Sequence, residues 1–166
     1  MSRFIAIEGG DGSGKGTQSK ILYDYAKKSG LDVMKVSFPR YGEASAYYIE
    51  KYLNGEYGGV NDVHPDLSSL TYALDRFAAS NEIRDYLKRP NSLVISDRYV
   101  ASNLAHQGAK IADSKKRHEF YERTIQTEYD ILALPRPDLN IVLTVPTETM
   151  QKNVDKKDVR GYTEKK

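Results

Sequence analysis

Hydrophobic and polar positions follow two alternating patterns along the chain. Short, nearly continuous apolar runs, of the kind that form buried strands, occur at residues 3–8, 31–38, 93–96 and 139–145. Helical patterns lie between and after them, at 17–29, 43–53, 65–87, after Arg98 and at 113–133. Strands that alternate with helices predict an α/β fold, in which a doubly wound parallel sheet is flanked by helices.

The spacing of apolar residues also predicts which face of each helix is buried. In the 65–87 helix, which should carry Pro65 in its first turn, the predicted core face consists of Leu67, Leu70, Leu74 and Phe77. The corresponding residues are Ile21, Leu22 and Ala26 in the 17–29 helix, and Phe120, Ile125, Tyr129 and Leu132 in the 113–133 helix.

The predicted elements stop after the fourth strand. We treat residues 1–166 as a single domain, and we expect that its C-terminal part is truncated. The reason is that a further helix and a fifth strand would take on the order of 20–30 residues.

The composition excludes several classes of protein. The chain has 166 residues, no cysteine and a net charge of +2. Disulfides, thiolate metal sites and cysteine nucleophiles are therefore excluded, and the near balance of charge gives no reason to expect nucleic acid as a partner. No apolar stretch approaches the roughly 20 residues of a membrane span, and no signal-peptide pattern precedes the first strand. We therefore expect a cytoplasmic enzyme.

A glycine-rich segment lies between the first predicted strand and the first predicted helix. Its spacing, Gly9-x4-Gly14-Lys15, is that of a loop whose backbone N–H groups cradle phosphates, with the lysine reaching the β- and γ-phosphates. Gly16 stands where a magnesium-binding Ser or Thr is usual, and Thr17 follows one residue later. The residues expected to bind the nucleotide are Gly10, Asp11, Gly12, Ser13, Gly14, Lys15, Gly16 and Thr17.

Cationic residues follow the other predicted strands. Arg40 comes after the second strand and Arg98 after the third. Ligands of open parallel sheets bind at the carboxyl ends of the strands, so we expect Lys15, Arg40 and Arg98 to serve one crevice that holds at least two phosphate groups. Asp97 either caps the following helix or orients waters of a magnesium ion, and these two roles are compatible.

Tyr72 and Arg76 lie one turn apart on the 65–87 helix. An aromatic ring beside a guanidinium suits a nucleobase, because the ring stacks and the guanidinium bonds carbonyl oxygens. The pattern also fits ordinary surface residues, and the spacing alone leaves both interpretations open.

Taken together, these segments resemble the thymidylate kinases, which are P-loop nucleoside-monophosphate kinases. The resemblance covers the whole chain in the family's order. It rests on residues 7–15, on Phe-Pro-Arg-Tyr at 38–41, on Tyr-Ala-Leu-Asp-Arg at 72–76, on Asp-Arg-Tyr-Val-Ala-Ser-Asn at 97–103, and on Leu-Pro-Arg-Pro-Asp at 134–138.

The resemblance implies roles for individual residues. Lys15 and the loop amides would hold the ATP phosphates, whereas Arg40 and Arg98 would hold the phosphate of the acceptor dTMP. The acceptor's sugar and base would meet Asp11, Phe38, Tyr41, Tyr72, Arg76, Asn103, His106 and Gln107. His106 stands where some members carry a tyrosine that excludes a ribose 2′-hydroxyl.

The family places a lid beyond the fourth strand, which corresponds here to about 153–166. This stretch is basic, with Lys156, Lys157 and Arg160. Position 12 is Gly and not the Arg that some members carry in the loop. The resemblance therefore implies that Arg160 supplies charge to the transition state and that Tyr162 neighbours the acceptor.

The implied reaction transfers the γ-phosphate of ATP to dTMP, with Mg²⁺ held by Thr17, Asp97, waters and phosphates. The family also implies a homodimer. The alternatives are a kinase for dUMP, UMP, CMP or AMP, a nucleoside kinase, or a nucleotide-binding protein without turnover. A nucleoside acceptor would leave Arg40 and Arg98 without a phosphate to bind.

Overall fold

The computed structural model describes residues 2–156. They form two compact units. The first unit contains the described residues of Met1–Ser37, Asp85–Arg98 and Pro137–Lys166, and the second contains Phe38–Arg84 and Tyr99–Arg136. Each unit is described by itself below.

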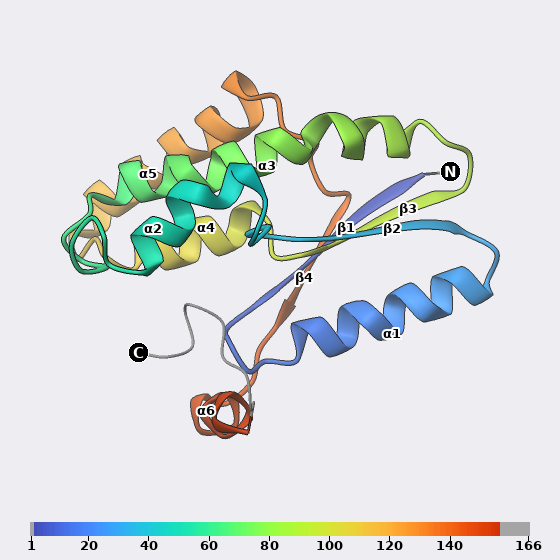
Figure 1. Ribbon diagram of the computed structural model, residues 1–166, viewed down its shortest axis with the longest axis horizontal. Helices are drawn as coiled ribbons and strands as arrows, with labels where there is room; N and C mark the ends of the chain where they lie inside the picture. The colour runs from blue at the N-terminus through green and yellow to red at the C-terminus, as the bar shows by residue number, and fades with distance from the viewer. Residues whose placement is uncertain (1, 157–166) are drawn as a thin grey trace. The chain divides into compact units, whose positions relative to one another are not determined.

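The first unit is built on a parallel sheet (Figure 1). It has four strands in the order β2-β3-β1-β4. The strands are β1 (Arg3–Gly9), β2 (Asp32–Ser37), β3 (Ser92–Asp97) and β4 (Leu139–Leu143). The register pairs Ile5 of β1 with Ile95 of β3 on one side and with Leu139 of β4 on the other. The sheet and the helices that alternate with its strands confirm the predicted parallel α/β fold.

The core of this unit lies between the sheet and α1 (Lys15–Lys28). It consists of Ile7, Ala26, Val33, Leu93 and Ile95. Leu22 packs against this cluster, but the prediction for Ile21 was wrong, because its side chain is 55% exposed. The second strand is also less buried than its apolar run suggested. It is an edge strand, and Val33 is its buried position.

The second unit is helical. Its elements are a 3₁₀ turn (Ala44–Ala46), α2 (Tyr47–Leu53), most of α3 (Pro65–Leu87), α4 (Val100–Gly108) and α5 (Ser114–Ile125), which continues as a π-helical segment (Gln126–Ile131). The helix predicted at 113–133 is thus two elements. The last helix, α6 (Thr147–Asp155), belongs to the first unit.

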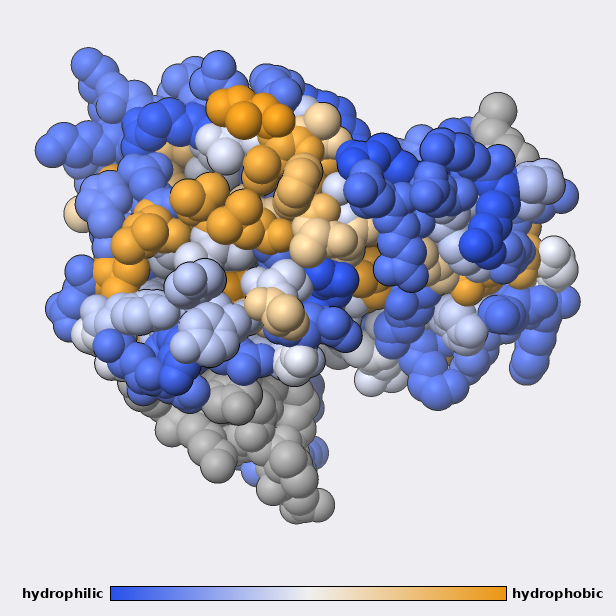
Figure 2. All heavy atoms as spheres, turned by 45° about the horizontal axis from the view of Figure 1, so that its top comes forward, coloured by the Kyte–Doolittle hydropathy of each residue, from blue (hydrophilic) through white to orange (hydrophobic). Residues whose placement is uncertain are grey.

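The predicted core face of α3 is wrong, although the bounds of the helix are confirmed. Leu67, Leu70, Leu74 and Phe77 are between 42% and 58% exposed. Figure 2 shows apolar side chains gathered in a patch on the surface of this unit. The buried positions of α3 are instead mostly small or polar, namely Ser68, Ser69, Ala73, Asp75, Arg76, Ala79 and Ser80, and Ile83 is the large apolar residue among them.

The physical reason is that polar side chains of α3 bond to its neighbours. Ser69 of α3 accepts from Asn103 of α4, and Arg76 of α3 pairs with Glu128 of the π-helical segment. These side chains take the inner face, so the apolar stripe faces outward. The predicted apolar side of the 113–133 segment shows the same error at Ile125, which is 39% exposed.

In the part of the chain that the structure describes, no helix combines the length and the apolar character needed to cross a membrane.

Candidate functional site

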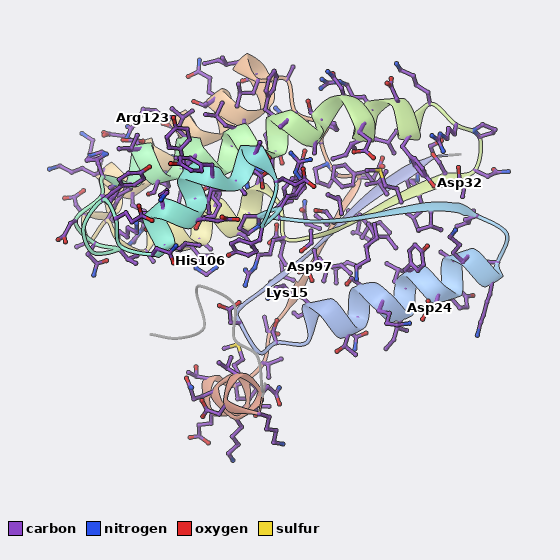
Figure 3. The ribbon with its side chains drawn as sticks, viewed as in Figure 1. Lys15, Asp24, Asp32, Asp97, His106 and Arg123 are labelled. Atoms are coloured by element: carbon purple, nitrogen blue, oxygen red, sulfur yellow. The ribbon has the colours of Figure 1, made fainter. Side chains whose placement is uncertain are left out.

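The phosphate loop of the first unit joins β1 to α1, as the sequence predicts. Gly14 caps α1 with a φ of 92°, a left-handed conformation that suits glycine. Lys15 opens the helix and is 7% exposed, and its Nζ donates to the carbonyl oxygen of Gly10 at 2.8 Å. The ammonium is thus held over its own loop (Figure 3), where the start of a helix favours anions.

Arg98 lies against the same loop. Its Nη1 donates to the carbonyl oxygen of Gly9 at 3.1 Å, and its Nη2 forms an ion pair with Asp11. The backbone of Arg98 has a φ of 65°, an unusual value for a residue with a side chain. The backbone N–H of Arg98 donates to Ile7, so the end of β3 is fixed to β1. The structure therefore brings together Asp11 and Arg98, which were both predicted as site residues.

The predicted magnesium ligands lie at the start of α1. The Oδ2 atom of Asp97 is 3.7 Å from the position that a Cβ would occupy at Gly16, and Thr17 is the next residue. Among residues 2–156, no group of three or more His, Asp or Glu side chains forms a metal cluster. Magnesium in kinases needs fewer protein ligands, because one or two carboxylates act together with phosphates and waters. A carboxylate and a hydroxyl at this place fit that requirement.

The helix α6 packs across the phosphate loop, which the sequence did not predict. Asn153 Nδ2 donates to the carbonyl oxygen of Gly12 at 2.8 Å. A Cβ at Gly12 would lie 2.2 Å from the carbonyl oxygen of Met150, and the φ of Gly12 is 79°. Any larger residue at position 12 would therefore collide with the backbone of α6, which gives a steric reason for the glycine at this position.

In the second unit, Arg40 is held by an acid that the sequence analysis did not assign. Asp75 of α3 accepts from the backbone N–H of Arg40 at 2.8 Å and from its Nε at 3.0 Å. Ser45 donates to the same carboxylate at 2.6 Å and accepts from Arg40 Nη2 at 2.7 Å. Asp75 is fully buried. The guanidinium of Arg40 is therefore fixed before any ligand binds.

The aromatic residues near Arg40 differ in their exposure. Phe38 is buried and packs on Tyr99, with ring centroids 5.8 Å apart. The hydroxyl of Tyr99 donates to the carbonyl oxygen of Pro135 at 2.9 Å, and burial raises the pKa of this phenol above its ordinary value. Tyr41 is exposed, so it is accessible to a ligand in a way that Phe38 is not.

The predicted base-reading residues Arg76 and Asn103 meet at one buried carboxylate. Glu128 Oε2 accepts from Arg76 Nε at 2.6 Å, and Oε1 accepts from Arg76 Nη2 at 2.6 Å. The Nδ2 atom of Asn103 donates to Glu128 Oε1 at 2.8 Å. Arg76, Asn103 and Glu128 are all buried. The structure thus brings together two residues that are 27 positions apart in the sequence (103 − 76).

The remaining predicted residues of this unit lie on α3 and α4. Gln107 is buried, and its Oε1 accepts from Ser68 at 2.7 Å. His106 is exposed (Figure 3), and Tyr72 is partly buried. Lys110, just after α4, bonds the hydroxyl of buried Tyr52, and burial lowers the pKa of this ammonium.

The residues predicted for the lid lie at the end of the described part of the chain or beyond it. Lys157, Arg160 and Tyr162 lie outside the described residues, whereas Lys156 is exposed at the end of α6.

Two buried acids, Asp75 and Glu128, were not predicted as site residues. Asp75 stands directly before Arg76, inside a segment that carried the family resemblance, so its position was available as a signal. Glu128 follows Phe120 and Thr124 at steps of four, and all three are buried. This spacing would have placed Glu128 on the inner face of the helix, but no local sequence pattern indicates which residues it contacts.

The chain is similar in sequence to known proteins. The family model described as thymidylate kinase matches residues 7–166. A thymidylate kinase from Mycobacterium tuberculosis (strain H37Rv) is 37% identical over 147 residues, which are 87% of this chain and 66% of that protein. A thymidylate kinase from Plasmodium falciparum is 33% identical over 109 residues, which are 66% of this chain and 50% of that protein.

The fold is also similar to a solved structure. A thymidylate kinase from Candida albicans superposes with a TM-score of 0.68 at 26% identity, covering 96% of this chain and 68% of that one. The chain spans 66% of the length of the Mycobacterium tuberculosis protein. With a family model that matches nearly its whole length, the chain belongs to the thymidylate kinase family.

Proposed function

We propose that this protein transfers the γ-phosphate of ATP to dTMP and releases dTDP and ADP. The observation that best supports the proposal is the convergence of Arg76 and Asn103 on one buried carboxylate. A phosphate loop alone would fit many nucleotide-binding proteins, whereas two fixed polar side chains of this kind suit the edge of a base.

The first unit supplies the donor side of the proposed reaction and one cation for the acceptor. The loop amides and Lys15 bind the β- and γ-phosphates of ATP, whereas Arg98, anchored on Gly9 and Asp11, binds the acceptor phosphate. Asp97 and Thr17 would hold Mg²⁺ together with phosphates and waters. When bound, this ion would neutralise charge on the phosphate oxygens.

The second unit supplies the acceptor side. Arg40, fixed by Asp75, binds the phosphate of dTMP, and Tyr72, Arg76 and Asn103 bind its base. An oxygen of the dTMP phosphate attacks the γ-phosphorus, the bond to the β-phosphate oxygen breaks, and ADP leaves. No general base is needed, because a phosphate monoester with a second pKa of about 6 is largely ionised at neutral pH. Arg160, which lies outside the described residues, is predicted to add positive charge to the transition state.

The acceptor is the part of the proposal that most needs a direct test. The relative from Candida albicans is described as having broad substrate specificity. We therefore propose assaying ADP release from ATP with dTMP, dUMP, UMP, CMP and AMP as acceptors. The expected result is release with dTMP at the highest kcat/KM. A higher kcat/KM with another acceptor would replace dTMP by that nucleotide, and no release with any acceptor would favour a binding protein without turnover.

We also propose that the protein forms a homodimer through α3. The support is the outward stripe of Leu67, Leu70, Leu74 and Phe77, because an apolar surface of this kind on a folded unit usually meets a partner. A second copy is the simplest occupant, since identical helices can pack by two-fold symmetry. Light scattering should give the mass of a dimer, and Leu74→Arg should give the mass of a monomer. A monomeric wild-type protein would contradict the proposal.

The cytoplasmic location, and the absence of nucleic-acid and membrane partners, remain predictions from composition.

A further inference from the structure

Glu128 is a buried acid to which no role has yet been given. It is 0% exposed and lies in the π-helical segment Gln126–Ile131 that continues α5. Segments of π-helix are rare and often occur at functional sites. Its carboxylate accepts from residues of two different helices, Arg76 of α3 and Asn103 of α4. One side chain therefore fixes both residues that were predicted to read the base.

Two acceptors favour the same orientation of the Asn103 amide: the Glu128 carboxylate, at 2.8 Å, and the more distant carbonyl oxygen of Ser69. A carboxylate paired with a guanidinium only accepts hydrogen bonds, so the Nδ2 end of the amide must face it. Nδ2 also lies 3.0 Å from Ser69 Oγ and 3.2 Å from the carbonyl oxygen of Ser69. The other end, Oδ1, is buried and has no hydrogen-bond partner among the residues that the structure describes.

A buried carbonyl oxygen without a partner is suited to a ligand that donates. Buried polar groups are nearly always bonded, so each exception needs a reason. An N–H group of a bound base would provide the missing bond. The guanidinium of Arg76 complements this, because its pair with Glu128 involves two of the five N–H donors that an arginine carries. An N–H group of Arg76 that is not used in this pair suits a carbonyl oxygen of the base.

We propose that Glu128 is a positioning residue that sets the hydrogen-bonding polarity of the base site. With Asn103 presenting an acceptor and Arg76 presenting donors, the site favours a pyrimidine that has a ring N–H beside a carbonyl group, as in thymine and uracil. Cytosine is disfavoured, because its ring nitrogen at that position accepts and its exocyclic amine donates. This inference rests on the proposed function, since it assumes that unit two binds the acceptor.

The competing explanation is that the pair of Arg76 and Glu128 only joins α3 to the end of α5. A buried ion pair of this kind loses much stability when one partner is removed. A loss of stability in a variant would therefore not distinguish the two explanations. The ratio between two bases does distinguish them, because a general loss of structure affects both bases alike.

The deciding variant is Glu128→Gln. A glutamine amide both donates and accepts, so the Asn103 amide can turn its oxygen toward position 128. We expect the preference for dTMP over dCMP, measured both as kcat/KM and as equilibrium binding by calorimetry, to fall about tenfold or more. The KM for ATP should stay within about twofold of the wild-type value, because the first unit is untouched.

Two further variants make the result interpretable. Asp66→Asn removes the exposed pair of Asp66 with Arg123, which also joins α3 to α5, and it should leave the ratio unchanged. Glu128→Asp keeps the charge but shortens the side chain, so we expect an intermediate ratio. If Glu128→Gln does not fold, Glu128→Asp decides. A ratio equal to that of the wild type in the folded variant would overturn the proposal.

Failure of this proposal can be told apart from failure of the proposed function. If the wild type binds dTMP in preference to dCMP but transfers no phosphate, and Glu128→Gln loses the preference, the positioning role stands and the kinase proposal fails. If the wild type phosphorylates dTMP and Glu128→Gln keeps the preference for dTMP over dCMP, the kinase proposal stands and the positioning role fails. A wild-type protein that binds neither nucleotide would overturn both.

Discussion

The two units of this protein build their candidate sites in different ways. In the first, the proposed phosphate site consists of a short loop and its backbone, and the ammonium of Lys15 bonds a carbonyl oxygen only five residues away. In the second, buried acids hold the cations of the proposed acceptor site, and the paired residues are far apart in the sequence. Asp75 lies 35 residues from Arg40, and Glu128 lies 52 residues from Arg76.

This difference predicts that the two sites respond differently to mutation. A backbone cradle survives most side-chain changes, because its donors are main-chain N–H groups. A guanidinium held by a buried carboxylate depends on both partners, since removal of one leaves the other as an uncompensated charge. We therefore expect variants of Lys15 and Arg98 in the first unit to lose activity without losing structure, and variants of the buried acids in the second unit to lose both together.

The largest expected effect is on turnover. Lys15→Met and Arg98→Ala should each lower kcat by about 10²–10³, the usual effect of removing one preorganised donor to a transition state. Circular dichroism should show an intact fold in both variants. Turnover near the wild-type level in either variant would reject the role assigned to that residue.

The corrected face of α3 gives the next largest effect. Ile83 is fully buried whereas Leu74 is 43% exposed. Ile83→Ala should therefore lower the free energy of unfolding by about 2–5 kcal/mol, because it removes buried methyl groups and leaves a cavity. Leu74→Ala on the same helix should cost only about 0.5 kcal/mol, as for other exposed sites, when denaturation is measured on monomeric protein. Equal losses of stability in the two variants would support the buried face of α3 that the sequence predicted.

Asp75→Asn tests the dependence of Arg40 on its acid. The variant keeps the shape of the side chain but removes the charge that holds the guanidinium. We expect kcat/KM for the acceptor to fall about 10- to 100-fold, in line with the loss of a charged hydrogen bond. The KM for ATP should not change. A proportional loss for both substrates would mean that Asp75 serves the fold alone.

Gly12→Ala tests the packing of α6 on the phosphate loop. Gly30 is the matched control, because its φ of 81° is close to the 79° of Gly12 and no atom lies within 4 Å of its added Cβ. Each substitution costs about 1–2 kcal/mol for the left-handed backbone. Gly12→Ala should cost more in urea denaturation, because its Cβ meets the Met150 carbonyl. The same cost in both would show that α6 does not constrain the loop.

The smallest effect concerns pH. Because burial lowers the pKa of Lys110 in the folded protein, the unfolded chain binds more protons above that pKa, and folding becomes more favourable as pH rises. The wild type should therefore gain stability relative to Lys110→Met as the pH rises toward 10.5, the ordinary pKa of lysine. Tyr52, whose pKa is raised by burial, is present in both proteins and so is common to the two curves. Parallel stability curves for the two proteins would contradict this account of Lys110.

The sequence predicted the first unit better than the second. The position of the loop from Gly9 to Lys15 was predicted correctly, because the strand, the glycine-rich loop and the helix follow one another directly in the chain. The bounds of α3 were also predicted, because Pro65 marks its start and the periodic pattern continues to Leu87. What periodicity cannot tell is whether an apolar stripe faces the core or a surface. Leu67, Leu70, Leu74 and Phe77 were placed inside for this reason.

The contacts of Asp75 and Glu128 could not be predicted from the sequence for a different reason. Both depend on side chains from other elements, and a single sequence gives no measure of which acid will meet which arginine. Met150 shows the same limit in the first unit. Its backbone explains Gly12, but no local pattern brings α6 to the loop.

The most direct test of the division between donor and acceptor units is dTMP binding by Lys15→Met, measured by calorimetry without ATP. If the first unit serves the donor and the second the acceptor, this variant should bind dTMP within about twofold of the wild type while its turnover is nearly lost. Loss of dTMP binding in Lys15→Met would contradict that division.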